Sequence, residues 1–180
     1  SCLAGGSDTH SFVPLWKPAF ISDLVSEERC FLSGVALLED EPKFVTAAAQ
    51  TNTAAGWKQA GLEQGVVIDV PTKEVVASGL QRPYCPRFHQ GRLWLLESGS
   101  GYLGYVDLSS GQFHQVAFLP GCVRSVDFIN HYAIVGVSRL HELEDNAVSG
   151  LLSRESQRHG RQPCCGLFII DLNSGETVGH

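Results

Sequence analysis

The chain has 180 residues, of which 43% are hydrophobic and 18% charged, with a formal net charge of -6. This composition is typical of a globular domain, and a chain of this length can bury roughly 70% of its unfolded surface. The sequence contains no block of basic residues and no apolar run approaching ~18 residues, which argues against a nucleic-acid groove and against a membrane span.

Six cysteines stand at positions 2, 30, 85, 122, 164 and 165, and no two of them form a CxxC pair. The spacing therefore indicates neither a zinc ribbon nor a thioredoxin-type site. Because the adjacent Cys164 and Cys165 could pair only under strain, we favour reduced thiols in a cytoplasmic protein. The chain starts at Ser1 and contains no methionine, so we expect that its original start was removed or lies upstream.

The first half of the chain consists of short strand-like runs separated by polar turns. Residues 1–23 contain SCLAGG and SFVPLWKPAFI, which we interpret as the last strands of a preceding structural unit. Residues 24–80 contain GVALLEDEPKFVTAA and GVVIDVPTKEVV. Each of these two stretches reads as two strands joined by a tight turn, which is the pattern of a β-hairpin.

The second half repeats this pattern twice. Residues 81–118 predict four strands, at Arg87–Phe88, Arg92–Glu97, Tyr102–Asp107 and Gln112–Phe118. Residues 119–180 contain SVDFINHYAIVGVS and CGLFIIDLNSGETVGH, separated by an insertion at 141–163. The insertion is predicted to form a short helix that acts as a lid, or else an interaction surface or a flexible insertion.

The spacing of these units indicates a β-propeller. Equivalent second strands contain Phe44, Leu93 and Ala133, which are 49 and 40 positions apart. Four strands at a period of ~40–50 residues are typical of propeller blades. We therefore predict an all-β fold, in which a β-propeller portion of about three four-stranded blades follows an N-terminal strand pair. All of it belongs to one partial domain, divided at residues 1–23, 24–80, 81–118 and 119–180.

An aspartate precedes the last turn of each unit, at Asp69, Asp107 and Asp171. Three aspartates at equivalent positions could suggest metal ligands. We favour a structural role, because an aspartate at the start of a turn accepts hydrogen bonds from the backbone that follows it. The sequence therefore predicts no metal site at these turns.

Three blades do not close a ring, because propellers have about 4–8 blades. An open half-ring would expose sheet edges, which soluble proteins avoid. We therefore expect the missing propeller half to come from upstream sequence, a second chain or a homo-oligomer.

Eight motifs in chain order carry a resemblance to a known family: SCLAGGSDTHSFVPLWKPAFIS, ERCFLSGVAL, GWK, GVVIDVPTKEVVASGL, PYCPRFHQGRLWLLESGSG, FLPGCVR, VGVSRLHE and CGLFIIDLNSGETVG. Together they resemble an uncharacterised bacterial β-propeller family of conserved hypothetical proteins, sometimes found beside TPR or sulfotransferase domains. Family members are roughly twice as long, so the resemblance implies that this chain corresponds to their C-terminal half. It implies no particular reaction.

The chain departs from the family pattern at positions where the family carries potential ligands. The family usually reads Cys-His-Leu-Asn-Gly where this chain reads CFLSG, so that Phe31 stands in place of the histidine. It usually reads Pro-His-Ser-Pro-Arg where this chain reads PYCPR, so that Tyr84 stands in place of the histidine. The family also favours acidic residues near Asn52. If the family is enzymatic, the resemblance implies that this member works differently or not at all.

Loops that enter the first strand and leave the second strand of each blade should lie at one end of the ring, where functional residues concentrate. Arg87, Arg124 and Arg139 are expected at that end. Their guanidinium groups could bind a carboxylate or phosphate bidentately. The alternative is that each arginine holds a carbonyl group of a neighbouring loop.

Three further residues are candidates at the same end. Glu97 ends an apolar strand just before SGSG and could coordinate a metal, act as a base or pair with an arginine. Asn52 is a weaker ligand candidate. Trp57 stands in a long loop and could line a ligand pocket or pack under its own loop.

Two functions are compatible with these features. The first is a binding or scaffold propeller that recognises a small anion, a peptide or a glycan on the loop face through Arg87, Arg124 and Arg139. The alternative is a metal-dependent hydrolase or lactonase of the six-bladed type, with Glu97 and Asn52 among its ligands. Cofactors are unknown, and a divalent cation is expected only under the alternative.

Overall fold

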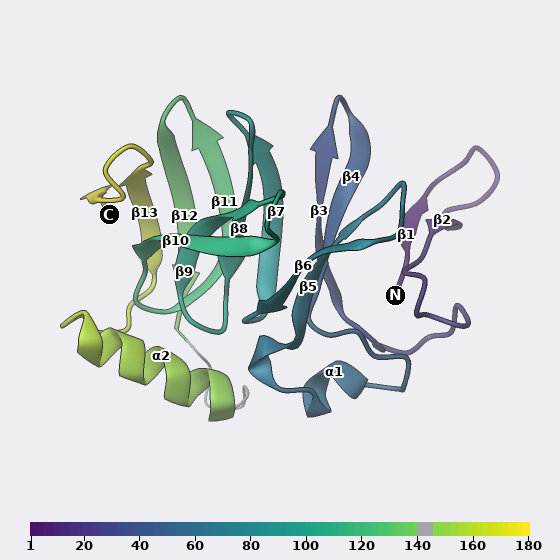
Figure 1. Cartoon of the computed structure of the whole chain (residues 1–180), viewed down its shortest axis with the longest axis horizontal. Helices are drawn as coiled ribbons and strands as arrows, with labels where there is room; N and C mark the ends of the chain where they lie inside the picture. The colour runs from purple at the N-terminus through teal and green to yellow at the C-terminus, as the bar shows by residue number, and fades with distance from the viewer. Residues whose placement is uncertain (140–145) are drawn as a thin grey trace.

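The computed structural model describes residues 1–139 and 146–180. Their regular structure is almost entirely antiparallel β-sheet, arranged as one two-stranded and three four-stranded sheets (Figure 1). The all-β, propeller-like portion expected from the repeats is therefore confirmed. Within the described residues, no helix combines the length and the apolarity that crossing a bilayer would require.

The N-terminal strand pair consists of β1 (Leu3–Gly5) and β2 (Val13–Trp16). It is tied to the next sheet by the indole nitrogen of Trp16, which donates a hydrogen bond to the carbonyl oxygen of Val70 at 2.8 Å. Buried Ile21 and Cys30 extend this contact into an apolar cluster with the first four-stranded sheet.

The first four-stranded sheet has the order β3-β4-β5-β6. Its strands are β3 (Leu32–Leu38), β4 (Glu41–Ala47), β5 (Gly65–Asp69) and β6 (Val75–Leu80). The connection from β4 to β5 contains helix α1 (Gly56–Gln59) and the 3-10 turn η1 (Leu62–Gln64). All five residues of β5 are buried, as expected of a continuous apolar run packed on both faces.

The second sheet is built from β7 (Pro83–His89), β8 (Arg92–Glu97), β9 (Tyr102–Asp107) and β10 (Gln112–Phe118). The last three strands begin and end where the sequence pattern predicted. Strand β7 is longer than the predicted Arg87–Phe88. A bulge interrupts its pairing with β8 between Tyr84 and Arg87, and Pro83 and Tyr84 pair with β8 on the N-terminal side of this bulge.

The third sheet contains β11 (Cys122–Ile129), β12 (Tyr132–Ser138), β13 (Gly166–Asp171) and β14 (Thr177–Gly179). Helix α2 (Asn146–Arg158) lies between β12 and β13, within the insertion expected at 141–163. Residues 140–145, with which this insertion begins, lie outside the described part of the chain.

The sheets pack face to face because side chains of a strand alternate between its two faces. In β8, Leu93 and Leu95 belong to the core shared with the first sheet. Trp94 and Leu96 belong to the core shared with the third sheet. A central strand buried on both sides needs no polar face, which explains the uninterrupted run LWLL.

The three turn aspartates make the local hydrogen bonds expected of them. An Asp107 side-chain oxygen accepts hydrogen bonds from the backbone and hydroxyl of Ser109, at 2.9 and 2.7 Å. Asp69 accepts from the backbone of Thr72, and Asp171 from that of Asn173. These carboxylates therefore stabilise the turn between the third and fourth strands of each sheet.

Candidate functional site

The connections predicted to share one end of the molecule do so. Helices α1 and α2 both lie at the lower end in Figure 1, while the β3–β4, β7–β8 and β11–β12 hairpins lie at the upper end. Strand β7 contacts both β3 and β11, so the first strands of the three sheets are neighbours. We call the lower end the loop end.

An aromatic–arginine cluster, which we define as Phe31, Trp57, Tyr84, Arg82 and Arg124, forms at the loop end. The ring of Phe31 stacks on Trp57 with centroids 4.5 Å apart and lies 6.0 Å from the ring of Tyr84. The guanidinium carbon of Arg82 lies 4.8 Å from the Trp57 ring centroid. That of Arg124 lies 5.6 Å from the Tyr84 centroid. The cluster therefore has an arginine at each end of three contacting rings.

Arg82 anchors the cluster from the connection between the first two sheets. It is 5% exposed, and its Nη1 donates a hydrogen bond to the carbonyl oxygen of Trp57 at 2.8 Å. The carbonyl oxygen of Arg82 in turn accepts a hydrogen bond from the backbone of Ser98 at 3.0 Å. A burial of this degree requires such pairing, because an unpaired charge would be costly.

Left-handed backbone conformations gather around the cluster. Phe31, Ala55, Arg82 and Cys85 have φ between 50° and 54°. Non-glycine residues rarely adopt these angles, which cost of order ~1–3 kcal/mol each and accumulate at binding and catalytic sites. Most other left-handed non-glycine residues in the described chain lie in hairpin turns, where such angles are usual.

Trp57, one of the residues predicted from the sequence, lies in α1 and is half-buried. Its indole nitrogen is buried and has no hydrogen-bond partner among the described residues. The Nζ of Lys58 lies 5.5 Å from the Trp57 ring centroid. Trp57 therefore belongs to the cluster and holds an unsatisfied donor there.

Phe31 also lines a cavity of about 610 Å³, together with Phe12, Leu24 and Val25. Two glutamates also line this cavity, and each contacts a basic side chain: Glu27 pairs with Arg29, and Glu28 with Lys58. The volume lies within the range of small-molecule sites.

Asn52 lies in a separate hydrogen-bond network. Its Oδ1 accepts hydrogen bonds from the backbone of Ser22 at 3.1 Å and from the Nη1 of Arg29 at 2.8 Å. Its Nδ2 donates to the hydroxyl of Ser22. Asn52 therefore holds the segment before β3 in place.

Arg87 lies within β7 and is exposed. Its Nη1 donates to the carbonyl oxygen of Val35 at 3.3 Å and to that of Pro86 at 3.1 Å. These bonds join β7 to β3, which is the carbonyl-holding alternative considered for this arginine.

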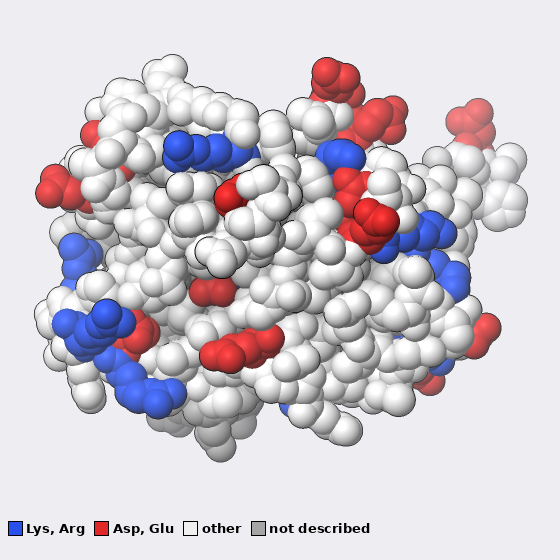
Figure 2. All heavy atoms as spheres, viewed as in Figure 1, with Lys and Arg blue, Asp and Glu red and all other residues white. Residues whose placement is uncertain are grey.

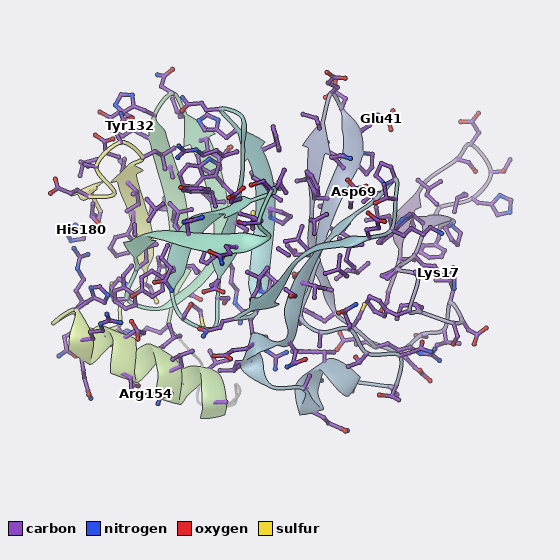
Figure 3. All side chains as sticks on the ribbon, in the orientation of Figure 1. Lys17, Glu41, Asp69, Tyr132, Arg154 and His180 are labelled. Atoms are coloured by element: carbon purple, nitrogen blue, oxygen red, sulfur yellow. The ribbon has the colours of Figure 1, made fainter. Side chains whose placement is uncertain are left out.

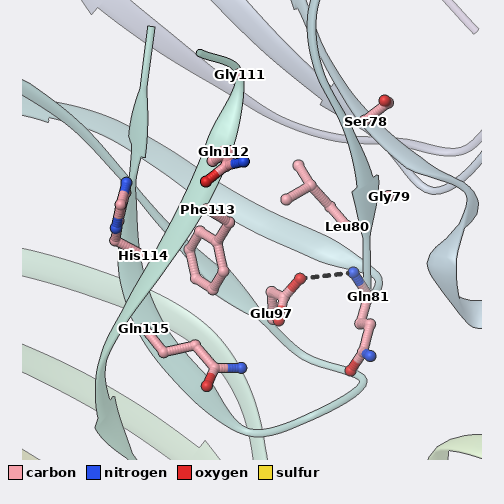
Figure 4. A pocket seen from close by; sticks show the side chains of 10 residues that line it. All are labelled: Ser78, Gly79, Leu80, Gln81, Glu97, Gly111, Gln112, Phe113, His114 and Gln115. Carbon is pink, nitrogen blue, oxygen red and sulfur yellow. Dashed lines mark hydrogen bonds between the residues drawn. The ribbon is translucent and has the colours of Figure 1, made fainter.

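Glu97 lies at the base of a cleft between β6 and β10, of about 560 Å³ (Figure 4). The carboxylate is 5% exposed and accepts hydrogen bonds from the backbone of Gln81 at 2.8 Å and from the hydroxyl of Ser100 at 2.9 Å. Burial raises the pKa of Glu97 above its usual value, although these two hydrogen bonds oppose the shift. Glu97 thus accepts its hydrogen bonds in a network separate from that of Asn52.

Arg139 is exposed and lines a small cavity beneath α2. Its backbone nitrogen donates to the Sγ of Cys165 at 3.2 Å. Of the six predicted residues, the structure thus brings only Trp57 and Arg124 into one cluster.

Sequence reasoning missed Phe31, Tyr84 and Arg82 as members of the cluster. A signal was present, because Phe31 and Tyr84 are the two positions at which this chain has an aromatic residue where the family usually has histidine. Their contact across β3 and β7 depends on how the two sheets pack. No sequence spacing could have supplied it.

Comparison with known proteins shows the family of the chain. The model of the domain of unknown function DUF4915 matches residues 1–180, so the chain belongs to this family. No curated protein matches the sequence.

Solved structures with similar coordinates share little sequence with the chain. The designed protein Ika4 is 14% identical with a TM-score of 0.47, over 88% of this chain and 78% of that one. The designed protein Ika8 is 14% identical with a TM-score of 0.43, over 81% and 35%. A complex of S. cerevisiae Dbp5 with Nup159, Gle1, IP6 and ADP gives 13% identity and a TM-score of 0.39, over 89% and 35%.

Proposed function

We propose that the chain is a ligand-binding propeller portion whose loop end recognises an anionic ligand with an apolar or aromatic body. The observation that carries this proposal is the aromatic–arginine cluster. Rings drawn from two neighbouring sheets make a continuous apolar surface, and a guanidinium group lies over each end of it.

The chemistry of the cluster suits such a ligand. A guanidinium group stacked on a ring presents its face to the ring, whereas its N–H donors lie in its plane and bind carboxylate or phosphate from the edge. Aromatic rings contribute apolar contact at little cost in side-chain entropy. The left-handed residues around the cluster support a binding role, because such backbone conformations accumulate at ligand sites.

The proposal is tested by titrating ¹⁵N-labelled protein with benzoate, which joins a carboxylate to an aromatic ring, and with neutral benzyl alcohol. We expect saturable shifts of the Trp57 indole signal with benzoate and weaker effects with benzyl alcohol. Arg124→Gln should weaken benzoate binding about tenfold, since a hydrogen bond to a charged group contributes ~1.5–3 kcal/mol.

Arg92 supplies a matched control. Its guanidinium carbon lies 4.5 Å from the Tyr105 ring centroid, in a strand that begins at the opposite, hairpin end of the molecule. Arg92→Gln should therefore leave benzoate binding unchanged. Equal loss in both variants, or no saturable shift at Trp57, would refute the proposal.

We do not extend the proposal to a metal-dependent hydrolase. The oxygen atoms of Asn52 and Glu97 accept hydrogen bonds in two separate networks. Within the described residues, no group of three or more histidine, cysteine, aspartate or glutamate side chains could hold a metal ion.

Completion of the ring by further blades stays a prediction, which the outer sheets support. Leu167 on the last sheet is 65% exposed, and Leu15 on the first strand pair is 69% exposed. Similar side chains are buried between the inner sheets. The molar mass in solution, measured by light scattering, tests whether the chain associates with further blades.

The cytoplasmic location is likewise a proposal, supported by six cysteines that are all unpaired.

A further inference from the structure

We infer that the cavity beneath α2 is a second binding site, which takes a small oxyanion of the phosphate, sulfate or carboxylate class. It lies between α2, the start of β11 and Arg139, and measures about 210 Å³. This is below the ~300–1,000 Å³ of sites for drug-sized ligands. A small ion therefore fits it better than an organic molecule of that size.

The polar lining of the cavity consists of hydrogen-bond donors. Ser149, Ser153 and Ser156 follow one another at intervals of four and three residues, so they share one face of α2. Arg139 faces the same cavity from the end of β12. Hydroxyl groups donate and accept, whereas guanidinium only donates, and together they match the acceptor oxygens of an oxyanion.

Ser156 gives the independent evidence for a ligand. Its side chain is 4% exposed and lines the cavity. Its Oγ is buried and has no hydrogen-bond partner among the described residues. Buried hydroxyl groups in native proteins are nearly always paired, and an exception calls for an unseen partner such as an ion or a water molecule.

The walls of the cavity are fixed by packing. Val148 and Leu152 are buried against Cys122, which holds α2 on the start of β11. A Cβ atom at Gly121 would lie 2.8 Å from the carbonyl oxygen of Ser138, so only glycine permits this close approach. The serines of α2 are therefore held in place before any ligand arrives, which favours binding.

Basic side chains lie on the helix that borders the cavity. Lysine and arginine side chains gather over part of α2 in Figure 2, on the lower left, and the helix carries the exposed residues Arg154 and Arg158. Acidic side chains lie close to them in the same view, and α2 also carries Glu155, whose Oε2 lies 3.8 Å from Arg158.

This site is distinct from the aromatic–arginine cluster, with which it shares no residue. The two proposals can therefore fail separately. Benzoate and the Trp57 signal report on the cluster, whereas the following experiment reports on Arg139 and Ser156.

The test measures the thermal unfolding temperature and the isothermal titration of the whole chain with phosphate, sulfate, acetate and chloride, at constant ionic strength. We expect saturable stabilisation by phosphate or sulfate and none by chloride. A response to acetate alone would assign the site to carboxylates. Arg139→Gln should weaken binding about tenfold or more, because it removes the charged donor.

Ser156→Ala makes the test specific. Without anion, this variant should unfold at the same or a higher temperature, because it removes a buried hydroxyl that lacks a partner. With phosphate, it should lose most of the stabilisation seen in the original chain. A purely structural role of Ser156 would not produce opposite effects in the two conditions.

Arg154→Gln is the matched control for charge. Arg154 lies on the same helix, exposed and on the side away from the sheets (Figure 3). We expect this variant to bind phosphate almost as well as the original chain. Absence of any saturable anion effect, as from a site that holds only water, would overturn the inference. So would equal weakening by Arg154→Gln and Arg139→Gln.

Discussion

The phenol hydroxyl of Tyr102 helps to hold helix α2 on the second sheet, and its removal should loosen the helix without unfolding the sheets. The hydroxyl of Tyr102 in β9 donates to the Oε2 of Glu155 at 2.8 Å and contacts the Nε2 of His159 at 2.9 Å. Its ring packs against Phe118 with centroids 5.4 Å apart. Tyr102→Phe keeps the ring contact and deletes only the oxygen.

The expected cost follows from these contacts. A hydrogen bond to a charged group contributes ~1.5–3 kcal/mol. Glu155 is partly exposed and also lies 3.8 Å from Arg158, so water and this arginine recover part of the loss. We expect α2 to be destabilised by about 1–2 kcal/mol, which corresponds to roughly 5–30-fold more frequent opening.

Amide hydrogen exchange resolved by residue is the assay, because it measures local opening. Exchange in α2 should accelerate by that factor in Tyr102→Phe, while exchange in β8 and β9 stays unchanged. Tyr105→Phe is the matched control on the same strand, since its hydroxyl makes no hydrogen bond among the described residues. Unchanged exchange in α2, or an acceleration spread evenly over the sheets, would refute the reasoning.

The same contacts predict a dependence on alkaline pH. Burial and the hydrogen bond to Glu155 raise the pKa of Tyr102 to about 12. The folded state therefore keeps a proton that the unfolded chain releases near pH ~10. The stability that this provides is complete below that pH and is lost as the pH rises toward 12. Tyr102→Phe should abolish this part of the loss.

Three further predictions concern a core leucine, a pair of glycines and a turn aspartate. Leu95→Ala should lower the free energy of unfolding in urea by ~2–5 kcal/mol, because Leu95 is fully buried between the first two sheets. Gly111→Ala should lower the free energy of unfolding by ~1–3 kcal/mol, since Gly111 has φ of 72° and a Cβ there would lie 2.8 Å from the Val76 carbonyl oxygen. Gly150→Ala, in open space on α2, should instead raise it by ~0.5–1 kcal/mol. A change of the same sign in both variants would contradict this account. Hydrogen bonds from the turn serines lower the pKa of Asp107 to about 2. The stability that the Asp107 carboxylate provides is therefore complete above pH ~4 and is lost as the pH falls through 2. An NMR titration that places this pKa near its usual value would contradict the role given to these hydrogen bonds.

Much of the fold could be predicted from local patterns. Strands β8, β9 and β10 were located correctly because each is a period-two or fully apolar run bounded by turn residues. The first strand of each sheet was harder to delimit, because a bulge interrupts its pairing, as between Tyr84 and Arg87. The repeat of 40 to 50 residues supplied the sheet order, since neighbouring strands in the chain pair with each other.

The candidate site was less predictable, because residue type does not reveal which partner a side chain finds. Glu97, Asn52 and Arg87 carry groups suited to catalysis or binding, yet each makes its hydrogen bonds to nearby backbone or to neighbouring side chains. Phe31 and Tyr84 are unremarkable as residue types. They acquire a role only by meeting across two sheets.

The strands could be predicted and the site could not, and this difference has a physical cause. Hydrophobic periodicity and turn chemistry act over a few residues, so the order of residues fixed the strands, the closing aspartates and the four-stranded units. The twist and packing of whole sheets decide which loops meet, and these depend on contacts between residues far apart in the chain, such as Arg87 with Val35, which are 52 positions apart. The cluster around Trp57 and the cavity beneath α2 exist only through that packing.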